Sequence, residues 1–174
     1  QVTMTQYFLQ NLLLGKQLTD EQLADVPYPK TELYIHVAYK TTEMGAILGM
    51  TFFGPLIGLA RGRSVAAMKS AALKGGRIGA LALLPVGPIM TESMLSKAKA
   101  TPESIYDRSF RIRNNIGQVR TDRFCTYGSL VGAGVGVAMG SGVVNGFLVG
   151  VVVSTLSAGV YNNFISPEPK KSKE

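Results

Sequence analysis

The most constraining feature of this sequence is a stretch of 44 residues, Phe124 to Pro167, that contains no Asp, Glu, Lys, Arg or His. About 20 apolar residues are enough to cross the roughly 30 Å hydrocarbon core of a bilayer, so this stretch is about two spans long. Gly140, Ser141 and Gly142 lie near its middle and are typical of a turn. The sequence therefore predicts two membrane-spanning helices that form a hairpin.

Glycines recur at intervals of four residues in both halves of this stretch and again in the first half of the chain. At helical pitch this interval places them along one side of a helix, where a neighbouring backbone can approach closely. In lipid the backbone must satisfy its own hydrogen bonds, so a glycine-rich helix persists there. The predicted helix-packing glycines are Gly45, Gly49, Gly54, Gly58, Gly75, Gly79, Gly128, Gly132, Gly136, Gly140, Gly142, Gly146 and Gly150. We expect these faces to meet helices of neighbouring subunits.

Two further spans are predicted upstream, at about 42–60 and 72–95. The first is free of charge from Met44 to Ala60. The second is free of charge only over 78–91, so the basic side chains at its start must extend toward the lipid head groups. A soluble amphipathic helix followed by a re-entrant segment remains the alternative for this second region.

The predicted fold is an all-α membrane protein with four glycine-rich transmembrane helices and an N-terminal polar helical extension. Within the extension, an apolar helix face at 4–13 would lie in the membrane interface or contact a partner, and Thr19 begins a capping box. The predicted segments are the extension at 1–41, a membrane domain at 42–165 with spans at about 42–60, 72–95, 124–140 and 143–164 and a polar connection at 96–123, and a flexible tail at 166–174.

The net charge of +7 comes mostly from the connections and the tail. These charges are not interleaved with aromatic side chains as in a nucleic-acid-binding surface, so we expect contact with anionic lipid and no nucleic acid. A phospholipid such as cardiolipin is a plausible bound molecule, whereas a solvated helix remains the alternative for 96–123. The residues predicted to contact lipid or a partner are Arg61, Arg63, Arg108, Arg111, Arg113, Arg120 and Arg123.

Residues suited to catalysis are scarce. The chain has one histidine, His36, and one cysteine, Cys125, which excludes an internal disulfide and a cysteine-built metal site. We expect His36 to pack at the membrane interface, and Glu43 and Glu92 to be solvated at the ends of spans. The sequence therefore predicts no enzymatic activity, no cofactor, no metal and no small-molecule substrate.

Three features together resemble one protein family. They are four glycine-rich spans, a first span that ends in Leu59-Ala60-Arg61-Gly62-Arg63-Ser64, and Arg120-Thr121-Asp122 followed by Gly128, Gly132 and Gly136. The chain is similar over about 42–164 to the mitochondrial inner-membrane translocase-channel family, which includes an accessory subunit of the membrane arm of respiratory complex I. This chain has one residue between that Arg and Asp where the family pattern has three, which favours the accessory-subunit branch.

The resemblance implies a multi-pass protein of the mitochondrial inner membrane. Its expected function is that of a non-catalytic accessory subunit of the respiratory chain, in complex I (NADH:ubiquinone oxidoreductase), where it stabilises assembly through glycine-mediated packing against other membrane subunits. The alternative is a component of a protein import translocase. That function requires a polar, preferably acidic, path at membrane depth, and the predicted spans offer mainly hydroxyl groups and Asn145.

Overall fold

A computed structural model of the chain describes Gln10 and residues 19–166. The apolar helix expected at 4–13 lies almost wholly outside these residues, and so does the tail expected at 166–174. Every element in the described part of the chain is helical, which confirms the all-α fold class there. The elements are α2 (Asp20–Ala24), α3 (Pro29–Leu48), the π-helical segment η1 (Gly49–Phe53), α4 (Gly54–Gly62), α5 (Val65–Leu83), α6 (Val86–Lys97), α7 (Pro102–Asn114), α8 (Ile116–Ala138), α9 (Val143–Val160) and the π-helical segment η2 (Tyr161–Ile165).

Most helix starts carry a local signal that satisfies backbone N–H groups. The capping box at Thr19 forms as expected, because its hydroxyl accepts from the Gln22 backbone and the Gln22 side chain accepts from the Thr19 N–H. Ser64 and Thr101 cap α5 and α7 with their hydroxyl groups in the same way. Pro29 occupies the first position of α3, where its missing N–H costs nothing.

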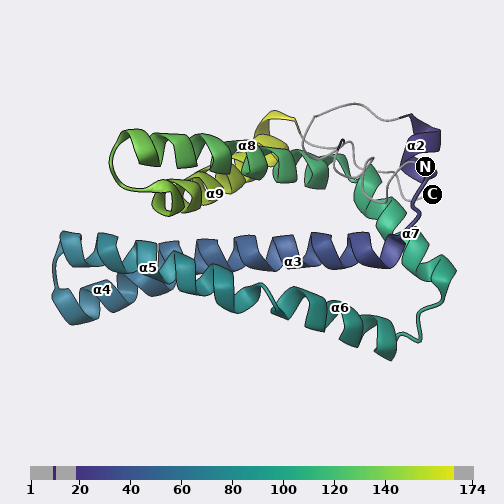
Figure 1. The fold of residues 1–174 in the computed structure, drawn as a ribbon, viewed down its shortest axis with the longest axis horizontal. Coiled ribbons are helices and arrows are strands. Elements are labelled where there is room, and N and C mark those ends of the chain that lie inside the picture. The colour runs from purple at the N-terminus through teal and green to yellow at the C-terminus, as the bar shows by residue number, and fades with distance from the viewer. Residues whose placement is uncertain (1–9, 11–18, 167–174) are drawn as a thin grey trace.

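The helices form two hairpins that lie in two layers (Figure 1). In the first hairpin α3, η1 and α4 make one continuous arm, and the chain returns as α5 and α6. In the second hairpin α8 turns and returns as α9. Figure 1 shows both turns at the same end of the molecule and α2 and α7 at the opposite end. This arrangement places the polar helix α7 as the link between the hairpins.

Glycines bring the two arms of the first hairpin into backbone contact. Gly45 and Gly49 face Gly79 and Gly75 of α5, with no side chain between the two backbones. A Cβ atom added to Gly58 would lie 2.6 Å from the Cα of Met68, closer than real Cβ atoms approach. The small residues thus permit a helix separation that any larger residue would prevent.

The second hairpin is built in the same way. Gly132 and Gly136 of α8 face Gly146 and Gly150 of α9. A Cβ atom on Gly132 would lie 2.8 Å from the Cα of Gly150, and one on Gly136 would lie 2.8 Å from the Cα of Gly146. Gly128 contacts the same helix, so the glycine face of α8 is covered over its whole length by α9.

These contacts revise the expectation that the glycine faces meet neighbouring subunits. In the described part of the chain they pack inside the two hairpins, because α8–α9 and α3–α5 present glycines to each other at matching heights. Gly140 and Gly142 have a different place from the other predicted packing glycines. Both have positive φ angles, 68° and 88°, and form the α8–α9 turn, where no atom lies within 4 Å of an added Cβ. Their role is the backbone conformation that other residues rarely adopt.

The boundaries of the spans also differ from those expected. The first span, expected at 42–60, and the last part of the polar helical extension before it form one continuous helical segment, Pro29–Gly62. The second hairpin covers the polar side of its first half. The region expected at 72–95 is the helical segment Val65–Lys97, interrupted at Pro85 between α5 and α6. Three segments are long and apolar enough to cross a bilayer, namely Pro29–Gly62, Val65–Lys97 and Val143–Ile165. α8 is not among them.

Candidate functional site

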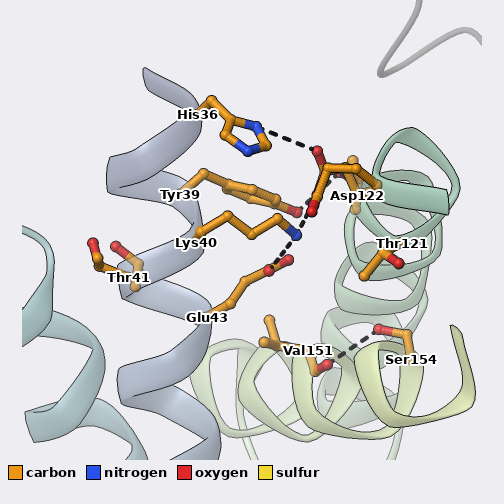
Figure 2. Close-up of polar contacts among 12 residues, drawn as sticks. His36, Tyr39, Lys40, Thr41, Glu43, Thr121, Asp122, Val151 and Ser154 are labelled. Carbon is orange, nitrogen blue, oxygen red and sulfur yellow. Dashed lines mark hydrogen bonds and ion pairs between the residues drawn. The ribbon is translucent and has the colours of Figure 1, made fainter. Parts of the chain in front are cut away.

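A group of charged side chains lies buried between the two hairpins (Figure 2). α3 contributes His36, Lys40 and Glu43, whose spacing of four and then three residues places them on one face of the helix. α8 contributes Asp122 from the other hairpin. We call these four residues the charge cluster.

Lys40 is the centre of the charge cluster. Its Nζ lies 2.7 Å from Oε2 of Glu43 and also forms an ion pair with Asp122. Nδ1 of His36 lies 3.7 Å from Oδ2 of Asp122, and Nε2 of Gln118 donates to Oδ1 of Asp122 at 3.0 Å. Asp122 is therefore held by side chains from both hairpins.

The contribution of the charge cluster to the free energy of unfolding depends on its burial. The side chains of Glu43 and Asp122 are only 6% and 7% exposed, and that of Lys40 is 24% exposed. Removal of one partner from a buried ion pair destabilises a protein by about 3–5 kcal/mol, because the other charge stays buried without compensation. One lysine between two carboxylates leaves an excess of negative charge while His36 is neutral.

Neutral polar groups extend the charge cluster along α8. The hydroxyl of Thr126 donates to the carbonyl oxygen of Asp122 at 2.8 Å, so in its 3.2 Å hydrogen bond with Tyr39 the tyrosine hydroxyl is the donor. Cys125 lies next to them as a free thiol and is only 1% exposed. Tyr39, Cys125 and Thr126 together line one side of a cavity between the hairpins.

This cavity has a volume of about 540 Å³ and mostly apolar walls. Glu43 lines it, and its Oε1 atom is buried without a hydrogen-bond partner. A buried acceptor without a donor carries a desolvation cost of about 1–3 kcal/mol. The cavity therefore combines an apolar interior with an unsatisfied acceptor in its wall.

The expectation that Glu43 would be solvated is wrong. The residue lies well inside the helix that begins at Pro29, and the second hairpin covers it. Glu92 is exposed as expected, and it pairs with Lys30 at 3.0 Å and accepts a hydrogen bond from Tyr34. The periodic spacing of the polar residues in α3 was the signal that could have revealed the buried face.

A second buried ion pair joins α7 to α3. The guanidinium of Arg113 forms two hydrogen bonds with the carboxylate of Glu32, and both side chains are almost completely buried. It also donates to backbone carbonyls of the segment around α2, including that of Asp25 at 2.8 Å. Arg113 was expected to contact lipid or a partner. It instead holds α2, α3 and α7 together, since a buried guanidinium requires several acceptors.

The other predicted arginines lie in different environments. Arg120 donates to Asn162 at 3.0 Å and to the carbonyl of Ser166 at 3.1 Å, and so contacts η2 and the residue that follows it. Arg111 is exposed and pairs with Asp107 one turn away at 2.8 Å. The exposed arginines at the α4–α5 turn are Arg61 and Arg63, and the partly buried ones are Arg108 and Arg123. The structure thus does not bring the predicted arginines together into one site.

One polar contact between the hairpins was not predicted. Nη2 of Arg77 in α5 donates to Oδ1 of Asn145 in α9 at 2.6 Å. The sequence singled out Asn145 as a polar residue of the predicted fourth span, but its partner Arg77 belongs to the other hairpin, 68 positions away. Among the described residues, no group of three or more His, Cys, Asp or Glu side chains is arranged to hold a metal ion.

The long apolar helices, the glycine-packed hairpins and the buried ion pairs define a class, that of all-helical proteins with apolar segments long enough to span a membrane. Within this class the chain belongs to the family described as "Protein of unknown function (DUF1757)", which matches residues 8–161. No curated protein matches the chain.

Proposed function

We propose that this protein is a non-catalytic accessory subunit of a membrane complex, with four membrane-spanning helices and a polar helical end. In this proposal α8 is the additional span, paired with α9, and α2 and α7 lie outside the bilayer. Residues 43 to 62 measure about 28 Å along a helix, at 1.5 Å per residue, which is close to the thickness of the hydrocarbon core. The charge cluster would then lie near one edge of that core.

The observation that carries the proposal is the apolar outer surface of the second hairpin. Its glycines are used inside the hairpin, so its outer face exposes large aliphatic and aromatic side chains. These exposed residues are Val131, Val135, Val137, Val144, Val149, Val153, Leu156, Val160 and Phe164. Such a surface is suited to lipid chains and to apolar helices of partner subunits.

The polar end supports a contact outside the bilayer. α7 is fixed on α3 by the buried Arg113–Glu32 pair, and it presents the exposed Arg111 outward. At the other end, Arg61 and Arg63 are exposed beside the α4–α5 turn, where a phospholipid such as cardiolipin would place its phosphates. We propose contacts with other membrane subunits at the first surface and with anionic lipid at the second.

The host complex is proposed from the resemblance of the sequence. It is the membrane arm of respiratory complex I in the mitochondrial inner membrane. A second candidate, a component of an inner-membrane import translocase, is favoured by one observation, which is that a buried carboxylate, Glu43, lines the cavity between the hairpins. The mostly apolar lining of the cavity weakens this candidate, because a path for basic segments needs polar groups along its length.

Native gel electrophoresis of the tagged chain after mild detergent extraction tests the proposal. We expect co-migration with complex I membrane-arm subunits, whereas co-migration with translocase subunits or precursor proteins would support the second candidate. Migration of the chain alone would contradict both.

A tryptophan scan along the outer face of α9, at Val149, Val153, Leu156 and Val160, adds a test of the surface itself. Partner contact predicts that a subset of positions loses incorporation while the protein still inserts. Incorporation at wild-type level for all four variants would exclude α9 as the contact surface.

A further inference from the structure

The cavity between the hairpins has features that the proposed function does not require. We propose that it binds a neutral membrane lipid whose head group is a free hydroxyl, as in a diacylglycerol, with that hydroxyl donating to Oε1 of Glu43. The inference depends on the cavity and on Glu43, and not on the identity of a host complex.

The walls of the cavity fit an apolar body. They consist mainly of aliphatic and aromatic side chains from α3, α5, α8 and α9, and the volume of about 540 Å³ lies within the range of about 300–1,000 Å³ of small-molecule sites. Four large apolar side chains of the lining are themselves exposed, namely Ile35, Leu84, Leu130 and Phe147. The cavity therefore opens between the hairpins toward the surface that would face the hydrocarbon, which is the route by which a lipid would enter.

The head-group preference follows from Glu43. Its Oε2 is paired with Lys40, whereas its Oε1 is buried and has no hydrogen-bond partner. A ligand hydroxyl would supply the missing donor and remove the cost of the unsatisfied acceptor. The hydroxyl groups of Tyr39 and Thr126, on the same wall, are already engaged with each other. The acceptor in this wall that is buried without any hydrogen-bond partner is thus the carboxylate oxygen of Glu43.

Charge excludes the common anionic lipids from this position. The charge cluster holds two carboxylates, one lysine and His36, so while His36 is neutral a phosphate or a fatty-acid carboxylate would meet excess negative charge. A comparison exists within the same molecule. A cavity of about 490 Å³ on the α3–α5 hairpin is similarly apolar, but its polar lining is basic, from Arg61 and Lys74. That cavity suits an anionic head group, and the one at Glu43 suits a hydroxyl donor.

The test uses the complete chain in phosphatidylcholine nanodiscs and a diacylglycerol that carries a photoreactive diazirine in one acyl chain. We expect saturable labelling of peptides that contain Leu148 and Val151, two apolar residues of the cavity wall. Unlabelled dioleoylglycerol should compete. The acetylated form, which lacks the donor, and dioleoylphosphatidic acid, which is anionic, should each compete at least tenfold less well.

Two variants make the assignment specific. Glu43→Leu removes the acceptor and should reduce labelling at least tenfold, whereas the matched control Glu92→Leu changes an exposed glutamate outside the cavity and should leave labelling unchanged. Circular dichroism and gel filtration establish that each variant is folded.

The proposal is overturned if the acetylated lipid or phosphatidic acid competes as well as dioleoylglycerol. Wild-type labelling of a folded Glu43→Leu protein would also overturn it, as would labelling that does not saturate. If Glu43→Leu does not fold, the competition series on the wild-type chain decides the question.

Discussion

Substitution of Lys40 by Met tests the energetic role of the charge cluster, because it removes a cation that Glu43 and Asp122 share. The variant keeps the apolar stem of the side chain but leaves two buried carboxylates without their lysine. Loss of one partner of a buried pair costs about 3–5 kcal/mol. Lys40 is 24% exposed, so water compensates part of this loss and we expect about 3 kcal/mol.

A matched control lies on the same helix. Lys30 also pairs with a glutamate, Glu92, at 3.0 Å, but both side chains are 52% exposed. Exposed ion pairs contribute less than about 1 kcal/mol, so Lys30→Met should have little effect. The free energy of unfolding of both variants can be measured in mixed dodecyl maltoside and dodecyl sulfate micelles by circular dichroism.

The triple variant Lys40→Met/Glu43→Gln/Asp122→Asn separates charge from packing. It removes the uncompensated charges and should recover most of the stability that Lys40→Met loses, since neutral replacements of buried ion pairs are often tolerated. Two results would refute the reasoning. One is a loss for Lys40→Met no larger than that for Lys30→Met, and the other is a triple variant less stable than Lys40→Met.

The remaining predictions concern helix packing, the turn and α7, and the same unfolding measurement checks each. Gly132→Ala should destabilise the second hairpin by more than about 1 kcal/mol, because the added Cβ would meet the α9 backbone. Gly134→Ala, where no atom lies within 4 Å of an added Cβ, should be neutral or stabilising. Equal effects of the two substitutions would contradict the packing argument. Gly142→Ala should cost about 1–3 kcal/mol, since its φ of 88° suits glycine, and an unchanged stability would show that the turn relaxes freely. Arg113→Met should cost about 3–5 kcal/mol and Arg111→Met less than about 1, and the reverse order would refute the assignment of the buried pair.

Much of the helical framework could be predicted from local sequence. The fourth predicted span, 143–164, corresponds to α9 and η2, and the turn at Gly140–Gly142 forms where the charge-free stretch is divided. Turns and helix caps depend on a few adjacent residues, and for that reason they can be predicted without knowledge of the tertiary structure. The division at 42 between a polar helical extension and the first span was not observed, because polar residues before 42 and apolar residues after it belong to one continuous helical segment, Pro29–Gly62.

The candidate site was much less predictable. Lys40 and Glu43 are close in sequence and could have been paired, but Asp122 belongs to the other hairpin, and its position depends on how the hairpins stack. The same holds for Arg113, whose partner Glu32 lies 81 positions away. The spacing of polar residues within α3 can indicate a buried face, but an interface between hairpins is specified by side chains from several helices at once, so this spacing does not show which residues of the other hairpin meet that face.

The sequence alone determined that the chain forms apolar helices with glycine faces and one tight turn, because helix period, hydropathy and turn chemistry are properties of neighbouring residues. Only the tertiary structure decided where those faces go. In the structure the glycines face each other inside the hairpins. Glu43, which was expected to be solvated at the end of a span, is a buried acceptor in the wall of a cavity. The physical reason is that burial depends on what covers a side chain, and here the cover comes from residues about 80 to 110 positions further along the chain.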